Sequence, residues 1–202
     1  SNNYPFLYNK IKETKFRTSH NLRKFKKEII YISTFRPNPN EELSLNHNKY
    51  HYNIDKYLLR IIKKFILTNN INLIILPVYK PNSKLKNIHE LIRMEKIYYS
   101  KILPVNKINF IYKNLNNFYA SKSDSLFVNI DSTLGYEMIL KGLKCVFFPI
   151  RDGINGVRIP VFSNFSNSGS FWCKKKEKLT IEKIIKYNFF CNRKNINSIK
   201  QK

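Results

Sequence analysis

The chain has 202 residues, of which 43% are hydrophobic and 14% aromatic, so it can form a core and is not globally disordered. Lysine and arginine together number 37 against 13 aspartates and glutamates, giving a net charge of +24. This excess favours an anionic partner such as a nucleotide, a nucleic acid or a membrane surface. The joint abundance of Lys, Asn and Ile is also what AT-rich coding sequence produces, so the charge alone does not decide between these readings.

Several classes of protein are disfavoured by what the sequence lacks. Cys145, Cys173 and Cys191 are an odd number without a CxxC pair, so we expect neither a zinc site nor a disulfide framework, and a reducing compartment fits. The four histidines are scattered, and we expect no metal and no cofactor. No apolar run approaches the roughly 20 residues that span a bilayer. We therefore expect a cytoplasmic protein, with peripheral contact to the inner membrane surface as an open alternative.

The order of predicted elements indicates the fold class. Five short runs rich in β-branched and aromatic residues predict strands over residues 28–35, 71–79, 108–112, 125–130 and 144–149. Helical periodicity predicts helices over residues 53–68, 85–102, 133–141 and 180–186, with Thr180 as N-cap of the last. We expect a further short helix or turn near Phe118, and loops over 36–52 and 150–172.

Strands that alternate with helices predict a parallel sheet covered on both faces. The fold class is therefore α/β, a Rossmann-like parallel sheet of about five strands. We expect residues 28–190 to form this domain, residues 1–27 to form a basic linker or arm, and residues 191–202 to form a basic tail.

One junction carries the strongest chemical signal. The predicted strand 125–130 stops at Asp131, Ser132 and Thr133, and a helix then begins with Gly135 in its first turn. Such a helix N-terminus offers backbone N–H groups and hydroxyls to an anion. Ordinary N-capping by Ser132 and tight packing at Gly135 explain the same residues without a ligand. There is no GxxxxGK[ST] and no GxGxxG motif, so P-loop and standard dinucleotide sites are not expected.

Ligands of parallel α/β sheets bind outside the carboxyl ends of the strands, which defines the other candidates. These are Ser33, Thr34, Arg36, Tyr79, Lys80, Lys84 and Arg151. We expect this edge to be rich in hydroxyls and cations and poor in carboxylates, as a phosphate-bearing ligand requires. Glu41 and Glu42 fall in the predicted first loop, and we place Glu90 and Glu95 on a helix surface. Phe171 and Trp172 are either an aromatic lid or a cover over the core.

Residues 131–137 (DSTLGYE) and 142–148 (GLKCVFF) resemble a segment of bacterial surface-carbohydrate transferases related to capsule and lipopolysaccharide synthesis, which are GT-B glycosyltransferase-like. Residues 169–172 (GSFW), 31–36 (YISTFR) and the stretch from Glu95 to Tyr99 are similar to further parts of that family. The resemblance covers most of residues 28–190. It implies the C-terminal, donor-binding half of such an enzyme, with an N-terminal acceptor half outside this sequence.

The resemblance also implies roles for individual residues. Ser132, Thr133 and Gly135 would meet the phosphates of a nucleotide-activated sugar, with Arg36 and Lys80 beside them. Glu137 and Asp131 would meet its ribose or sugar hydroxyls. The acceptor would be a saccharide or a lipid-linked saccharide, and the catalytic base would come from the N-terminal half.

Two other functions remain open from the sequence. A nucleotide-sugar epimerase of the same fold would need carboxylates in the cleft, where we expect only Asp131 and Glu137. A non-enzymatic basic module that binds nucleic acid or anionic membrane would show a basic patch remote from the strand ends.

Overall fold

A computed structural model describes residues 27–36, 41–103, 108–112, 122, 124–151 and 165–191, with only the helical backbone described for residues 41–51. The strands are β1 (Glu28–Ile32), β2 (Asn72–Leu76), β3 (Ile108–Phe110), β4 (Leu126–Asn129) and β5 (Lys144–Phe147). The helices are α2 (Glu41–Thr68), α3 (Ile88–Ile102), α5 (Thr133–Leu140) and α6 (Lys178–Phe190).

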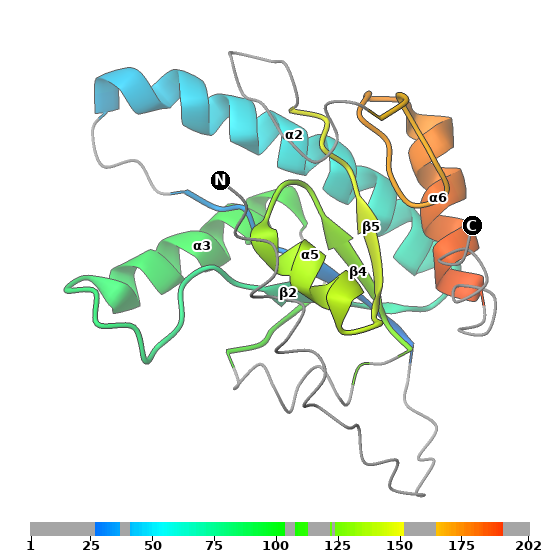
Figure 1. Cartoon of the computed structure of the whole chain (residues 1–202). Coiled ribbons are helices and arrows are strands. Elements are labelled where there is room, and N and C mark those ends of the chain that lie inside the picture. Colours follow the sequence, from blue (N-terminus) through cyan, green and yellow to red (C-terminus); the bar gives the residue numbers. More distant parts are fainter. Residues whose placement is uncertain are drawn as a thin grey trace, which may run out of the picture.

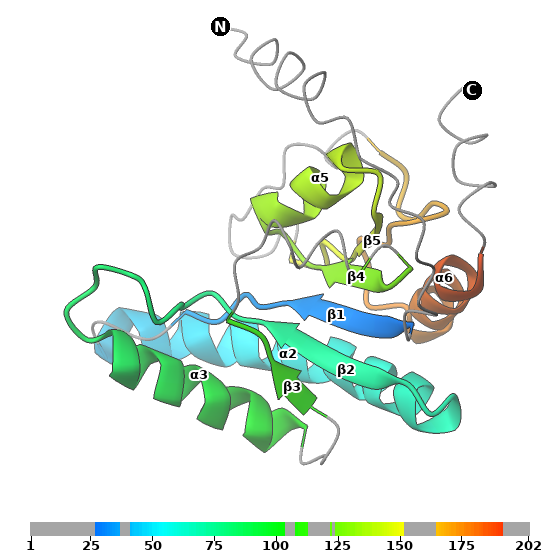
Figure 2. The same ribbon diagram turned by 90° about the horizontal axis from the view of Figure 1, so that it is seen from below.

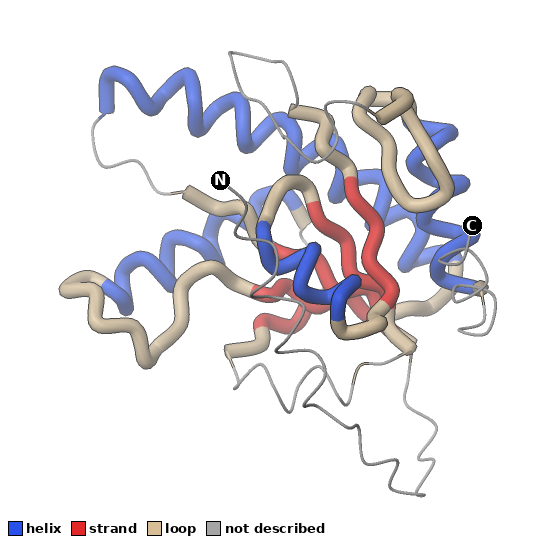
Figure 3. The backbone as a smooth tube through the Cα atoms, in the orientation of Figure 1, coloured by secondary structure: helices blue, strands red, loops and turns tan. Residues whose placement is uncertain are grey.

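The five strands form one parallel sheet in the order β3-β2-β1-β4-β5, which confirms the predicted fold class (Figures 2 and 3). The chain builds outward from β1 to β3 and then returns to the other side of β1 with β4. The direction of strand addition therefore reverses between β1 and β4. In sheets of this kind the crevice at the reversal is where ligands bind.

Helices cover both faces of the sheet, as predicted. Ile62 of α2, Tyr99 of α3 and Ile185 of α6 belong to one apolar cluster with alternate strand residues such as Val128. Met138 of α5 packs in a second cluster on the opposite face. Figures 1 and 2 show α5 on the other side of the sheet from α2 and α6.

The sequences of the inner strands β1 and β2 are nearly continuous apolar runs because both faces of these strands are buried. In β1, Ile29 and Tyr31 point into the first cluster while Ile30 and Ile32 point into the second, and all four are buried. Successive side chains of a strand point to opposite faces of the sheet, so one apolar strand contributes residues to both clusters.

The structure corrects two predicted boundaries. Helix α2 begins at Glu41, so the predicted loop through Tyr52 is wrong beyond residue 40, and Glu41 and Glu42 are helical. No glycine or proline occurs between residues 41 and 68, so nothing in this polar stretch interrupts the helix. Helix α6 begins at Lys178 with Glu177 at the N-cap position, so Thr180 is not the cap. Its hydroxyl instead donates to the Glu177 carboxylate over 3.1 Å.

Some predictions lie outside the described residues. They are the short helix near Phe118, nearly all of the arm 1–27 and of the tail 191–202, and residues 152–164 of the last loop. Where the loop is described, its end runs beside β5: Phe147 N–H donates to Phe171 O over 2.8 Å, and Cys173 N–H donates to Phe147 O over 3.0 Å. No helix in the described ranges is both long and apolar enough to cross a membrane.

Candidate functional site

The crevice between β1 and β4 brings two predicted groups of residues to one edge. Ser33 and Thr34 directly follow β1, and Asp131 and Ser132 directly follow β4, its neighbour in the sheet. These residues are nearly a hundred positions apart in sequence and meet only because β4 pairs with β1. The predicted edge therefore lies at the reversal of strand order.

The N-terminus of α5 is capped by Ser132, whose hydroxyl oxygen accepts from the backbone N–H of Leu134 over 3.3 Å. The Gly135 N–H bonds to the Ser132 carbonyl over 3.1 Å. Two of the N–H groups that we expected to be open therefore have partners within the turn. The hydroxyl groups of Ser132 and Thr133 are donors with which this turn can meet an anion, and Thr133 is exposed.

Asn129, the last residue of β4, fixes the geometry of this turn. Its side-chain amide donates to the Ser132 carbonyl over 2.8 Å, and its carbonyl oxygen accepts from the Ser132 N–H over 3.0 Å. A Cβ added at Gly135 would lie 2.1 Å from the Asn129 amide nitrogen. The glycine is thus explained by close packing of helix on strand, one of the two reasons we gave for it.

Arg151 follows β5 and reaches back across the same edge. One of its terminal nitrogens donates to an Asp131 carboxylate oxygen over 3.0 Å, and the Arg151 side chain is only 3% exposed against 26% for Asp131. The Arg151 guanidinium therefore orients the Asp131 carboxylate. Its positive charge is buried and faces Asp131.

Beneath this edge lies the carboxylate of Asp55, a residue of α2 that the sequence analysis did not single out. Asp55 is fully buried and accepts from the hydroxyls of Tyr31, of Tyr98 over 2.5 Å and of Thr34 over 3.1 Å. Burial raises the pKa of Asp55, while these hydroxyl donors and the nearby charge of Arg151 act in the opposite direction.

A second buried carboxylate belongs to Glu95 of α3, and its predicted surface position is wrong. Glu95 accepts from the Ser33 hydroxyl over 2.5 Å and from the backbone N–H groups of Val78 and Tyr79 over 3.0 and 3.3 Å. Burial raises its pKa, whereas these hydrogen bonds and the charge of Arg36 lower it. Glu90 on the same helix is exposed and pairs with Arg93, as its predicted surface position requires.

Three tyrosines complete the arrangement. The Tyr99 hydroxyl donates to the Ser33 hydroxyl oxygen over 2.8 Å and accepts from the Thr34 N–H at 3.3 Å. Burial raises the pKa of Tyr31, Tyr98 and Tyr99, so all three stay protonated and act as donors. We call the following set the carboxylate network: Tyr31, Ser33, Thr34, Asp55, Glu95, Tyr98 and Tyr99.

The carboxylate network overturns the expectation that this edge is poor in carboxylates. Neither Asp55 nor Glu95 forms a salt bridge with any residue in the described part of the chain. Each is instead held by neutral donors, which is how a buried polar group is satisfied without a cation. The network joins the end of β1 to α2, α3 and the end of β2, so it gives Ser33 and Thr34 fixed positions.

The remaining candidates lie at the surface of this edge. Arg36 is exposed, and its charge acts on Tyr79 and Glu95, which places it beside the end of β2. Lys80 is half-buried, and Lys84 is exposed. Glu137 is exposed on α5, one turn after Thr133.

Phe171 and Trp172 pack beside β5. The Phe171 ring lies 6.4 Å from that of Phe147, and the Trp172 indole N–H donates to the Ser166 carbonyl over 3.2 Å. A Cβ at Gly169 would lie 2.1 Å from the indole ring, so the glycine of the GSFW motif makes room for the tryptophan. This is the position of a cover over the core, one of the two alternatives given for this pair.

The described ranges were also compared with the arrangements that metal ions require. No group of three or more His, Cys, Asp or Glu side chains lies together there as metal ligands. Burial also raises the pKa of Cys145, which keeps that thiol protonated.

Comparison with known proteins identifies a family. The model of a protein family described as "putative O-antigen biosynthesis protein" matches residues 6–202. No curated protein and no solved structure matches the chain.

Proposed function

The chain belongs to this O-antigen biosynthesis family, which places it in surface polysaccharide synthesis, and from that premise we propose that it is the donor-binding half of a glycosyltransferase. The donor is a nucleotide-activated sugar, and the acceptor is a saccharide or lipid-linked saccharide. The observation that carries the proposal is the reversal of strand order between β1 and β4, with hydroxyl-bearing residues following both strands.

In the proposed complex the donor phosphates lie at the N-terminus of α5. The Ser132 and Thr133 hydroxyls donate to them, and the positive end of the helix dipole adds to the attraction. Arg36 and Lys80 approach from the ends of β1 and β2. These groups stabilise the nucleotide phosphate as it departs, which is the main electrostatic demand of sugar transfer. Gly135 contributes by letting α5 sit close to Asn129.

The sugar or ribose hydroxyls are assigned to the two carboxylates nearest the turn. Asp131 keeps one oxygen on Arg151 and offers the other. Glu137 is exposed on the face of α5 that also carries Thr133. Both carboxylates can accept hydrogen bonds from vicinal hydroxyls.

The catalytic base is proposed to lie in the N-terminal half that the family resemblance implies. Asp55 and Glu95 are fully buried, and each carboxylate accepts several hydrogen bonds from side chains or backbone groups. A base must reach the proton that it removes, so these two groups position the edge and do not perform the transfer. The same burial removes Asp55 and Glu95 as acid and base for the epimerase alternative, which leaves it only Asp131 and Glu137.

Isothermal titration of the protein with CMP-, UDP- and GDP-sugars tests the proposal. We expect one nucleotide class to bind, and Thr133→Ala to weaken that binding by about tenfold because one charge-assisted hydrogen bond is lost. Thr180→Ala is the matched control, since Thr180 also lies in the first turn of a helix but on α6.

The outcomes separate cleanly. Equal loss in the Thr133 and Thr180 variants would mean that the change in affinity does not report on the α5 turn. Absence of binding for all three nucleotide classes, in the protein joined to its acceptor half, would contradict the proposal.

A further inference from the structure

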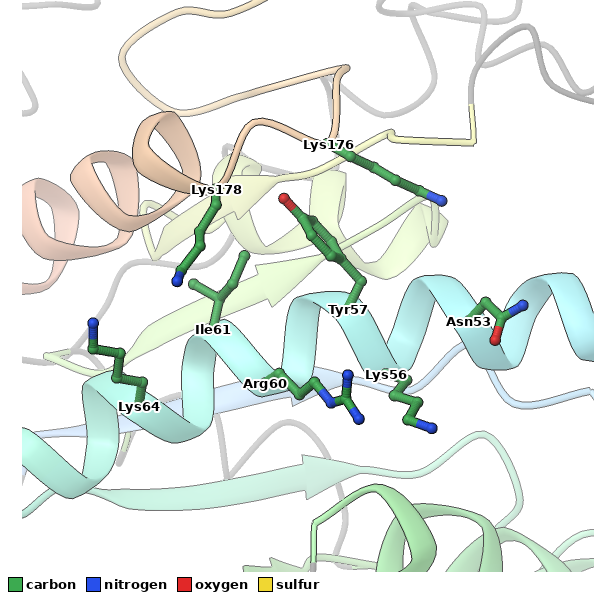
Figure 4. Close-up of a pocket in the computed structure, with 8 residues that line it drawn as sticks. All are labelled: Asn53, Lys56, Tyr57, Arg60, Ile61, Lys64, Lys176 and Lys178. Atoms are coloured by element: carbon green, nitrogen blue, oxygen red, sulfur yellow. The ribbon is translucent and has the colours of Figure 1, made fainter.

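A basic cavity of about 500 Å³ lies on the outer side of α2, against the segment that leads into α6 (Figure 4). Its lining residues are Asn53, Lys56, Tyr57, Arg60, Ile61, Lys64, Lys176 and Lys178. Five of these eight carry a positive charge and none carries a negative one. Figure 4 shows Lys64 and Lys178 directed toward each other from the two walls.

A second cavity, of about 360 Å³, continues along the same two helices. It shares Lys64 with the first and adds Lys183 and Lys186 from α6, with Glu182 as its acidic residue. The two cavities are lined by seven cationic side chains and by one acidic side chain, Glu182. Glu177, which precedes α6, is a second acidic residue nearby in the sequence. The surface between α2 and α6 is therefore strongly positive.

The outward side of α6 also exposes large apolar residues among these cations. Leu179 is 72% exposed, Tyr187 53% and Phe190 50%. With Lys183 and Lys186 they recur at helical spacing on one side, while Ile181 and Ile185 occupy the buried side. Surface apolar residues are ordinary when single, but three on one helical stripe beside a basic groove mark an interaction surface.

The spacing of the cations along α2 is unfavourable for the stability of the helix. Lys56, Arg60 and Lys64 follow one another at intervals of four residues, so neighbouring positive charges repel along one side of the helix. No salt bridge relieves these three within the described residues. A surface of negative charge placed opposite them removes this repulsion.

We propose that this surface binds an anionic lipid bilayer. The α2–α6 face comprises Lys56, Arg60, Lys64, Lys176, Lys178, Leu179, Lys183, Lys186, Tyr187 and Phe190. Its lysines and arginine meet the lipid phosphates, and Leu179, Tyr187 and Phe190 enter the boundary between headgroups and acyl chains.

The apolar stripe selects lipid over nucleic acid as the partner. A nucleic acid would use the cations and could stack bases on Tyr187 and Phe190, but an aliphatic side chain offers no stacking surface. Leu179 is the most exposed large apolar residue of the stripe, and burial of its side chain requires an apolar medium.

Binding through this face is compatible with an open sheet edge. Helix α5 lies on the opposite side of the sheet from α2 and α6 (Figures 1 and 2). A bilayer against the α2–α6 face therefore does not cover α5. The inference rests on α2 and α6 alone and stands independently of the donor site.

Co-sedimentation of the whole protein with vesicles tests the proposal. We expect binding to phosphatidylcholine vesicles containing about 30% phosphatidylglycerol, and little binding to pure phosphatidylcholine or in high salt. Reversal of three charges in Arg60→Glu, Lys64→Glu, Lys183→Glu should weaken binding by at least about tenfold. The matched control reverses three exposed lysines elsewhere, in Lys84→Glu, Lys86→Glu, Lys101→Glu, and should retain most of the binding.

The apolar contribution is tested separately. Leu179→Ser with Phe190→Ser should weaken binding to anionic vesicles, whereas Leu85→Ser with Ile97→Ser, on exposed apolar residues outside the α2–α6 face, should not. Equal losses in the two charge-reversal variants would show attraction by net charge and overturn the assignment to the α2–α6 face. Vesicle binding that survives the face variant, together with lost binding to a single-stranded oligonucleotide, would replace lipid by nucleic acid.

Discussion

The carboxylate of Glu95 accepts a hydrogen bond of 2.5 Å from the hydroxyl of Ser33, which lies 62 residues earlier in the chain. The same carboxylate accepts from the backbone N–H groups of Val78 and Tyr79. One side chain on α3 thus joins the residues that follow β1 to those that follow β2. These hydrogen bonds hold the ends of β1 and β2 in fixed positions at the carboxyl edge of the sheet.

Removal of the Glu95 carboxylate should destabilise the fold strongly. Glu95→Ala leaves a hydroxyl and two backbone N–H groups without their acceptor and opens a cavity, for which we expect a loss of about 2–4 kcal/mol in the free energy of unfolding. Urea titration of the two proteins measures it. Glu90→Ala on the same helix is the control, and we expect no measurable change because its pair with Arg93 is exposed. Similar effects of the two substitutions would contradict the role given to Glu95.

The pH dependence of stability should carry the signature of Asp55. Burial raises its pKa above the ordinary value of 3.8, so above that pH the folded protein retains a proton that the unfolded chain has released. The folded state then binds more protons than the unfolded state. Stability from this group is therefore present at low pH and is lost as the pH rises through the folded pKa.

Asp55→Asn isolates this effect because an amide keeps an acceptor for Tyr31 and Thr34 but does not titrate. We expect the wild type to lose stability relative to Asp55→Asn as the pH rises from about 4 to about 8, measured by urea titration at each pH. A difference that stays constant across this range, or changes in favour of the wild type, would show that burial does not raise the pKa of Asp55.

The sheet was predictable because its strands carry their signal locally. Runs such as residues 73–76 are apolar at every position, as strands buried on both faces require, and all five predicted strands are present. Strand order was not predicted, because the rule for parallel crossovers fixes the hand of each connection but not the return of β4 to pair with β1. The capped turn of α5 at Ser132 was likewise readable from a few adjacent residues.

The carboxylate network was not predictable in the same way, since its members come from three separate elements. Asp55 and Glu95 look like surface residues of charged helices, and only the packing of α2 and α3 on β1 buries them. One signal existed for Glu95: it shares a helical stripe with Ile88, Tyr99 and Ile102, all of which are buried. Asp55 similarly adjoins Ile54 and precedes Leu58 and Leu59 on the buried side of α2.

Gly135 should be irreplaceable for a reason of packing. An alanine Cβ would meet the Asn129 amide at 2.1 Å, so Gly135→Ala should lose about 1–3 kcal/mol of stability despite the better helix propensity of alanine. The free energy of unfolding, obtained from urea titration, measures the loss.

A double-mutant cycle identifies the contact. In an Asn129→Ala background the obstacle is gone, and Gly135→Ala should become neutral or slightly stabilising. Gly142→Ala is the comparison, because Gly142 has a φ of 73° and no atom within 4 Å of an added Cβ. Its cost, about 1 kcal/mol of backbone strain, should not change in the Asn129→Ala background. Equal costs of Gly135→Ala in both backgrounds would exclude the Asn129 contact as the cause.

Ser132 combines two roles that one substitution can separate. As the N-cap it accepts from the Leu134 N–H, and as a proposed phosphate ligand it donates its hydroxyl proton. Aspartate caps a helix as well as serine does but brings a negative charge and no donor, so Ser132→Asp should keep stability within about 0.5 kcal/mol of the wild type.

The same variant should bind the donor at least about tenfold more weakly, since its carboxylate repels a phosphate at the α5 turn. Ser132→Ala should instead lose about 1 kcal/mol of stability, because the cap is removed. Its loss of affinity for the donor should be smaller than that of Ser132→Asp. Urea titration and calorimetric titration of the three proteins give both quantities. An affinity of Ser132→Asp equal to that of the wild type would place the phosphates away from this turn, while a large loss of stability would mean that Asn129 does not admit an aspartate cap.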